Sequence, residues 1–141
     1  MLNISGADFE SLPESFGELK NLQAINISGC RLKALPESFG NLENLKVLNI
    51  SGCKLSNVPD SFGNLKNLNA LSLSGNNLIK FPKSIGNLVN LKKLDLSNNK
   101  LTKLPESISK LTKLKEINLR GNPLFEIPKF LQNPPKLKIE F

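Results

Sequence analysis

A leucine recurs at intervals of 23 residues through most of this chain, and this period constrains the fold more than any other feature. The recurring residues are Leu22, Leu45, Leu68, Leu91 and Leu114. In this frame nearly every apolar residue falls into register, as in the consecutive units LQAINISGCRLKALPESFGNLEN and LKVLNISGCKLSNVPDSFGNLKN. A fixed period of roughly 20 to 50 residues indicates units that bury their apolar faces against one another. The sequence therefore predicts a solenoid.

The first half of each unit alternates apolar and polar residues, as residues 24–28 show with Ala, Ile, Asn, Ile and Ser. Such alternation is typical of a short strand with one buried face. Successive strands then form one parallel sheet. Asparagines follow the later strands at Asn76, Asn99 and Asn122. We expect these amides to turn inward and bond backbone groups left open by the bend.

The second half of each unit begins with a proline, at Pro13, Pro36, Pro59, Pro82, Pro105 and Pro128. Proline suits the first position of a short helical turn because its φ is fixed and it lacks an N–H donor. The residue three positions later must point inward: Phe16, Phe39, Phe62, Ile85, Ile108 and Leu131. We expect Gly17, Gly40, Gly63 and Gly86 to let the backbone reverse. The core is then rejoined by Leu42, Leu65, Leu88 and Leu111.

The strand motif L-x-x-[IL]-x-[IL]-x-x-[CN]-x-L, seen in five consecutive units, resembles the leucine-rich-repeat family. This resemblance implies an α/β solenoid, a right-handed coil with a concave parallel β-sheet and short helical or 3-10 turns on its convex side. The LPxx(F/I)gxLxxL half is similar to Ras-group and Scribble-like intracellular proteins and to leptospiral-type bacterial proteins. The near-identity of the units at Leu22 and Leu45 favours the bacterial set.

One domain is expected over residues 1–141, because a chain of this length with 39% hydrophobic residues has little room for two. The expected parts are a partial first repeat (1–21), regular repeats (22–44, 45–67, 68–90 and 91–113), a divergent repeat (114–136) and a terminal edge strand (137–141). In the divergent repeat, Phe130, Pro134 and Pro135 replace small convex residues. Lys138 and Glu140 would protect the final edge.

The chain starts in mid-strand, without a polar helix or a disulfide cap before Met1. We expect either that the native chain is longer or that the open end self-associates through Leu2, Ile4 and Phe9. An exposed apolar edge favours such pairing.

The net charge of +7 is unevenly distributed. Residues 1–67 contain six Lys or Arg and seven Asp or Glu, whereas residues 68–141 contain thirteen and five. The basic half either attracts an acidic partner or forms an ordinary solvated surface.

Cys30 and Cys53 are separated by one repeat period and therefore occupy equivalent positions in neighbouring turns. Ala7 fills the same position in the first turn. We expect two buried thiols, although strands about 4.8 Å apart also bring two such residues within reach of a disulfide.

Catalysis is poorly supported, since the chain has no His, Trp or Tyr and no Gly-rich phosphate loop. The acidic residues Glu37, Asp60 and Glu106 fall one per repeat on the convex side, a spacing that favours solvation. Two cysteines without His are too few ligands for structural zinc. We therefore expect no enzyme activity, metal, cofactor or small-molecule substrate.

No segment predicts membrane insertion or a signal peptide. The repeats favour a cytoplasmic protein, and a secreted bacterial protein remains open.

The concave face is the predicted binding surface, because parallel strands present their outward residues in rows. The first row is Ala24, Val47, Ala70, Lys93 and Glu116. The second row is Asn26, Asn49, Ser72, Asp95 and Asn118. The third row is Ser28, Ser51, Ser74, Ser97 and Arg120. These rows are small and uncharged at first and charged toward the C-terminus.

Three functions follow from this surface and this charge. The first is a protein-binding module that uses the concave rows; the second is a structural or self-assembling spacer. The third is a binder of an anionic surface or nucleic acid, through Lys92, Lys93, Lys100, Lys103, Lys110, Lys113 and Lys115. Nucleic acid is disfavoured because these lysines form no single stripe and no aromatic residue interleaves them.

Overall fold

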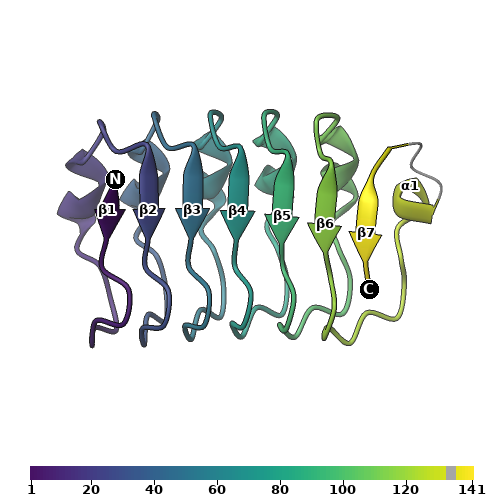
Figure 1. Ribbon diagram of the computed structural model, residues 1–141, viewed down its shortest axis with the longest axis horizontal. Coiled ribbons are helices and arrows are strands. Elements are labelled where there is room, and N and C mark those ends of the chain that lie inside the picture. Colours follow the sequence, from purple (N-terminus) through teal and green to yellow (C-terminus); the bar gives the residue numbers. More distant parts are fainter. Residues whose placement is uncertain (133–135) are drawn as a thin grey trace.

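The computed structural model describes residues 1–132 and 136–141, whose turns stack side by side into an α/β solenoid (Figure 1). The described residues form one parallel sheet, with strands in chain order. The strands are β1 (Leu2–Asn3), β2 (Ala24–Asn26), β3 (Val47–Asn49), β4 (Ala70–Ser72), β5 (Lys93–Asp95), β6 (Glu116–Asn118) and β7 (Lys138–Glu140). The predicted fold class is confirmed. Backbone hydrogen bonds between neighbouring strands run along the stack.

Short 3-10 turns line the side opposite the sheet (Figure 1). They are η1 (Glu14–Glu18), η2 (Glu37–Asn41), η3 (Asp60–Asn64), η4 (Lys83–Asn87) and η5 (Glu106–Lys110), followed by α1 (Lys129–Gln132). Each 3-10 turn starts directly after its proline, so the prediction that proline takes the first position is wrong by one residue. The Pro13 carbonyl accepts the first hydrogen bond, from the Phe16 N–H at 3.0 Å, while the ψ of Pro13 is still extended at 157°.

The inward residues of the convex side form a continuous core, as predicted. Phe39 and Phe62 are fully buried, and Ile85, Ile108 and Leu131 are buried after them. The ring centroids of Phe39 and Phe62 lie 6.3 Å apart with nearly parallel planes. A stacked pair of this kind stabilises neighbouring turns beyond the area that it buries.

The glycines of the 3-10 turns have a different role from the predicted backbone reversal. Gly40 and Gly86 do not have positive φ; a Cβ at Gly86 would lie 2.5 Å from the Ser107 carbonyl oxygen of the next turn. These glycines are needed because the turns approach each other so closely. Positive φ occurs instead after the strands, as at Gly29 and Gly52.

The asparagines after the strands turn inward, as predicted. The Asn76 amide nitrogen donates to the Ile50 and Leu73 carbonyls at 2.7 and 3.0 Å, and its oxygen accepts from the Leu55 N–H at 3.0 Å. Asn76 is 6% exposed. Each such asparagine therefore joins its own turn to the preceding one.

Cys30 and Cys53 occupy the equivalent position in the earlier turns, and both are buried as predicted. Their sulfur atoms lie 2.9 Å apart, and the Cys53 thiol donates to the Ile27 carbonyl at 3.2 Å. Burial raises the pKa of the Cys53 thiol to about 11. The reactive thiolate is thus disfavoured at neutral pH.

The last turn departs from the regular pattern. The strand expected within residues 137–141 is present as β7, parallel to β6, while Pro134 and Pro135 lie outside the described residues. At the other end, Leu2, Ile4 and Phe9 pack partly buried against the core. No helix in the described ranges is long and apolar enough to span a membrane.

Candidate functional site

The strand register aligns the predicted concave residues side by side. Val47 pairs with Ala24 on one side and Ala70 on the other, and the same register continues to Lys93 and Glu116. The second row follows through the pairs that join Asn26, Asn49, Ser72, Asp95 and Asn118. The third row, Ser28, Ser51, Ser74, Ser97 and Arg120, lies directly beyond the strand ends. The structure therefore aligns the first two rows on one face, whereas the third row lies past the ends of the strands.

Sequence reasoning missed the residues that extend these rows at both ends. Asn3 pairs with Asn26, and Lys138 and Glu140 pair with Glu116 and Asn118. The step from β6 to β7 is 22 residues, one fewer than the regular period, so β7 falls out of the repeat frame. Its charge pattern predicts an edge strand but not this register.

A groove of about 390 Å³ runs over the sheet from β3 to β7. We call it the sheet groove. Its outward-facing lining residues are Val47, Asn49, Ala70, Ser72, Lys93, Asp95, Glu116, Asn118, Lys138 and Glu140. Val47 is 45% exposed, a large apolar side chain open to solvent near one end of this groove. The sheet groove thus joins a small, apolar zone to a charged zone.

Several side chains of the second row also support the fold. The oxygens of Asn26 and Asn49 each accept a hydrogen bond from the backbone N–H two residues on, at 3.0 Å. Asp95 accepts in the same way from the Ser97 N–H at 2.9 Å. These bonds form Asx-type turns that end the strands. The side chains are therefore held in fixed positions on the groove floor.

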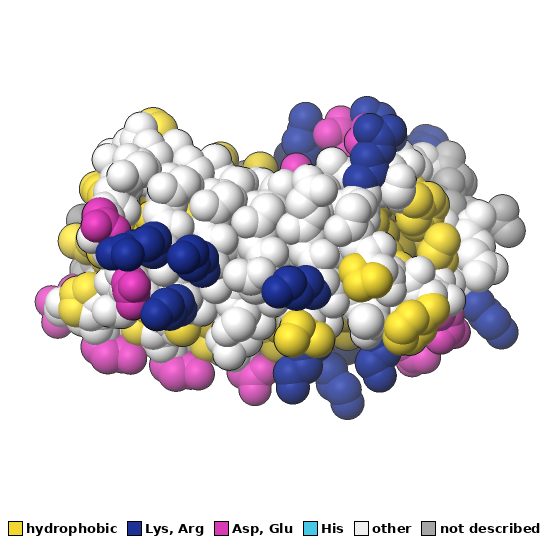
Figure 2. Space-filling model, turned by 90° about the horizontal axis from the view of Figure 1, so that it is seen from below, with side chains coloured by type: hydrophobic (Ala, Val, Ile, Leu, Met, Phe, Trp, Pro, Cys, Tyr) yellow, Lys and Arg dark blue, Asp and Glu magenta, His cyan; other side chains and the backbone are white. Residues whose placement is uncertain are grey.

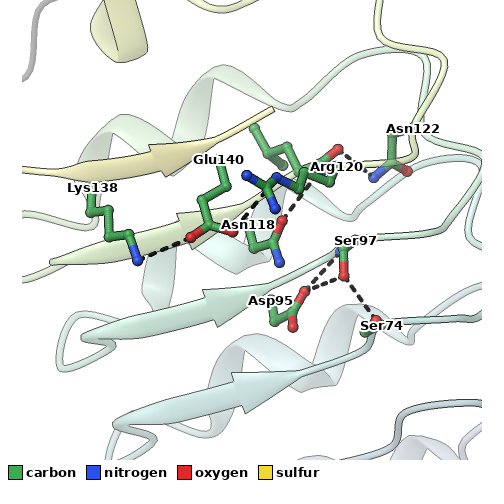
Figure 3. A network of polar contacts seen from close by, with 9 residues as sticks. Ser74, Asp95, Ser97, Asn118, Arg120, Asn122, Lys138 and Glu140 are labelled. Atoms are coloured by element: carbon green, nitrogen blue, oxygen red, sulfur yellow. Dashed lines mark hydrogen bonds and ion pairs between the residues drawn. The ribbon is translucent and has the colours of Figure 1, made fainter.

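Ser97 differs from the other predicted contact residues because it is only 5% exposed. Its hydroxyl donates to the Asp95 carboxylate at 2.6 Å and lies 2.8 Å from the Ser74 hydroxyl (Figure 3). The expectation that Ser97 faces a partner directly is therefore corrected. Its hydroxyl is instead bonded within the protein, to Asp95 and Ser74.

Ion pairs gather at the C-terminal end of the sheet groove. Lys93 lies 3.4 Å from Glu116. Figure 3 shows Glu140, which lies 3.0 Å from Lys138 and 3.8 Å from Arg120. The hydrogen bond and charge of Lys138 lower the pKa of Glu140, and Glu140 in turn raises the pKa of Lys138. Such exposed pairs add little stability. They fix the orientation of the charged side chains on this part of the surface.

The basic residues of the C-terminal half do not form one stripe, as predicted. Lys93 lies on the sheet, and Lys92 and Lys115 precede strands. The loops after the strands carry Lys100 and Lys103. Lys110 ends η5, and Lys113 donates to the Asn90 side chain at 2.7 Å. An extended polyanion would not meet all of these groups at once.

Metal ligation finds no support in the described part of the chain, where no three His, Cys, Asp or Glu side chains gather in a way that could hold an ion. The acidic residues Glu37, Asp60 and Glu106 each begin a different 3-10 turn. Their one-per-turn placement matches the expected solvated row.

Comparisons with known proteins agree with the repeat pattern. Residues 1–76 match the family profile described as "Leucine-rich repeat region", and residues 81–124 and 67–88 match two profiles described as "Leucine rich repeat". The comparison with curated proteins gives no match.

The structure is similar to that of a leucine-rich-repeat protein of Leptospira interrogans, with a TM-score of 0.87. The two sequences are 37% identical, and the match covers 92% of this chain and 33% of that protein. The chain therefore spans about a third of the length of this relative. The expected likeness to leptospiral repeat proteins is confirmed.

Proposed function

The chain belongs to the leucine-rich-repeat family, and on this premise we propose that its concave sheet face binds another protein. Domains of this family generally mediate protein–protein interaction. The observation that carries the proposal is the sheet groove of about 390 Å³, into which two in-register rows of side chains face. A partner segment that lies across the strands would contact several turns at once.

The two zones of the sheet groove suggest how such a partner is recognised. Val47 and Ala70 offer apolar contact without charge, and the hydrogen-bonded Asn49 and Ser72 lie beside them. Lys93 and Glu116 offer opposite charges farther along the groove. Apolar contact would supply most of the affinity, and the charges would set the register and the association rate.

The experiment compares two double variants that add the same charge on opposite sides of the molecule. Val47→Arg with Asn49→Arg blocks the sheet groove, whereas Asn64→Arg with Asn87→Arg changes exposed positions of η3 and η4. Circular dichroism first establishes that both variants are folded. Partners captured from lysate by the wild type are identified by mass spectrometry, purified and titrated against all three proteins.

We expect the sheet-groove variant to lose at least about tenfold in affinity for a purified partner, because two long charged side chains occupy its contact surface. The convex variant should stay within about twofold of the wild type. Equal affinities of the two variants would refute the concave face as the binding surface.

A further inference from the structure

A second recess of about 800 Å³ lies away from the sheet, where the loops after the strands enter the last convex turns. We call it the loop hollow. Its walls include the apolar Phe81, Leu104 and Phe130, and its rim carries lysines from three successive turns. These lysines are Lys80, Lys83, Lys103 and Lys129. The loop hollow shares no residue with the sheet groove.

The loop hollow forms where the glycine packing of the earlier turns is lost. Gly86 allows η4 to approach Ser107 of η5 closely. One period later Ser109 stands in place of the glycine, and Phe130 stands in place of the serine. Both substitutions add bulk between η5 and α1, so the last two turns cannot pack as closely as the others. The recess is thus built into the sequence of the last repeat.

The rim of the loop hollow has a positive surplus that the fold does not neutralise. Four lysines face Glu106 and Glu126, and all six residues are exposed. Within residues 1–132 and 136–141, none of these six lies within 4.0 Å of an opposite charge. An anionic partner can therefore pair with these lysines without breaking an existing ion pair.

Exposed apolar side chains adjoin this rim. Ile79 and Phe125 are 59% and 81% exposed, and they neighbour the rim residues Lys80 and Glu126 in sequence. The Phe125 N–H donates to the Thr102 carbonyl at 3.3 Å, which holds its loop beside the preceding one. Figure 2 shows several yellow side chains over the C-terminal half of the molecule seen from below, with dark blue side chains near them and a separate dark blue group over the N-terminal half. Exposed apolar groups ringed by charge are typical of a protein contact.

We propose that the loop hollow binds an acidic protein segment that carries apolar side chains. The apolar side chains enter the recess, and the acidic ones pair with the rim lysines. A nucleic acid fits less well, since its evenly spaced phosphates would meet Glu106 and Glu126, whereas a peptide can place apolar residues opposite these two glutamates. A flat membrane cannot reach the recessed walls of Phe81 and Leu104. This site is separate from the concave surface and serves a second contact.

Defined probes test the charge and the shape together. The first is a fluorescein-labelled peptide of about ten residues that mixes Glu with Leu and Phe. The others are polyglutamate of equal length, a short single-stranded oligonucleotide, and vesicles of phosphatidylcholine with phosphatidylserine. We expect the mixed peptide to bind at least about tenfold more tightly than polyglutamate in fluorescence anisotropy. Neither the oligonucleotide nor the vesicles should match it.

Three variants then place the peptide on the molecule. Lys80→Glu with Lys103→Glu should reduce its affinity at least about tenfold, whereas Lys54→Glu with Lys66→Glu makes the same charge change elsewhere and should reduce it less than about threefold. Ser109→Trp fills the recess without changing charge and should also abolish tight binding. The sheet-groove variant Val47→Arg with Asn49→Arg should bind the peptide normally, which separates this proposal from the concave one.

Several results would overturn the proposal. If the mixed peptide does not bind, an acidic segment with apolar side chains is not the ligand. If polyglutamate, the oligonucleotide or the vesicles bind equally well, the binding is only unspecific charge attraction. Equal losses in the two lysine variants lead to the same conclusion. Full affinity in a folded Ser109→Trp variant places the peptide outside the loop hollow.

Discussion

The buried asparagines show how single side chains join one turn to the next. The Asn99 amide nitrogen donates to the carbonyls of Leu73 and Leu96 at 2.9 and 3.0 Å. Its oxygen accepts from the Leu78 N–H at 3.1 Å. A thiol at the same position, as in Cys53, has only one hydrogen to donate. The asparagine therefore satisfies more buried backbone groups than the cysteine does.

We predict that Asn99→Ala lowers the free energy of unfolding by about 2 to 3 kcal/mol, because the backbone groups that it bonds lose their buried partners. The neighbouring Asn98 provides a control: it is exposed and has a φ of 54°, in a conformation that glycine adopts freely. Asn98→Gly should change stability by less than about 0.5 kcal/mol. Urea unfolding measures both variants. Equal losses would refute the bonding role of Asn99.

The sequence predicted the inward turn of the asparagines because their spacing places them where the strand bends. It did not predict that Ser97 is buried, because Ser28, Ser51 and Ser74 share its position and remain partly exposed. Its hydroxyl bond to Asp95 is not the difference, because Ser51 donates to Asn49 in the same way and is partly exposed. Ser97 differs in its next row neighbour, which is Arg120 where each of the other serines is followed by a serine. Side-chain pairing between row members is not visible in a repeat pattern.

The 3-10 turns are held together by close backbone contact. A Cβ at Gly40 would collide with the carbonyl oxygen of Ser61, although the φ of Gly40 is not positive. Gly29 is the opposite case, since its φ is 69° and the nearest atom to a Cβ is 3.9 Å away. Within one repeat, glycine is therefore required for close packing at Gly40 and for positive φ at Gly29.

We predict that Gly40→Ala destabilises the protein by about 1 to 3 kcal/mol through overpacking. Gly29→Ala should cost about 1 to 2 kcal/mol through the strained left-handed backbone. Asparagine separates the two causes, because it tolerates positive φ but adds bulk. In thermal unfolding, Gly29→Asn should have a higher melting temperature than Gly29→Ala. Gly40→Asn should have a lower melting temperature than Gly40→Ala. A reversed order would contradict this assignment.

The sequence could not separate these two glycine roles, because glycine marks both positive φ and close approach. Position within the repeat predicted that Gly17, Gly40, Gly63 and Gly86 matter, but the reason appears only when the next turn is in place. The proline prediction failed for a smaller reason, since the ψ of Pro13 decides where the turn begins. Element boundaries depend on such local angles.

At the scale of the whole molecule, stability comes from contacts between neighbouring turns. Each strand from β2 to β6 buries one residue toward the core between two outward ones, as Leu71 lies between Ala70 and Ser72 in β4. Leu71 is 2% exposed. A charge at this position would be trapped between turns on both sides.

We predict that Leu71→Asp lowers the free energy of unfolding by about 4 kcal/mol or more, because a buried carboxylate finds no partner there. Ala70→Asp lies one residue away on the outward side, where Lys93 is its strand neighbour. The free energy of unfolding of this variant should stay within about 1 kcal/mol of the wild-type value. Circular dichroism during urea titration compares the two, and a stable, cooperative Leu71→Asp variant would show that the strand register is wrong.

The overall architecture was predictable because the leucine period repeats without interruption up to Leu114. The last turn was not, because β7 is one residue early and Phe130 replaces a serine. Both changes alter how the last turn packs against the turn before it. They cannot be predicted from the pattern of the earlier repeats. The loop hollow lies at this break in the pattern.

The direction of the backbone hydrogen bonds between strands also has a mechanical consequence. These bonds run along the stack, so a pull applied to both ends loads them in series. Bonds in series open one after another, and the weakest joint opens first. Each regular turn that detaches releases 23 residues, or roughly 80 Å of extended chain. Under tension the molecule should therefore lengthen in steps of one repeat, as its turns detach one at a time.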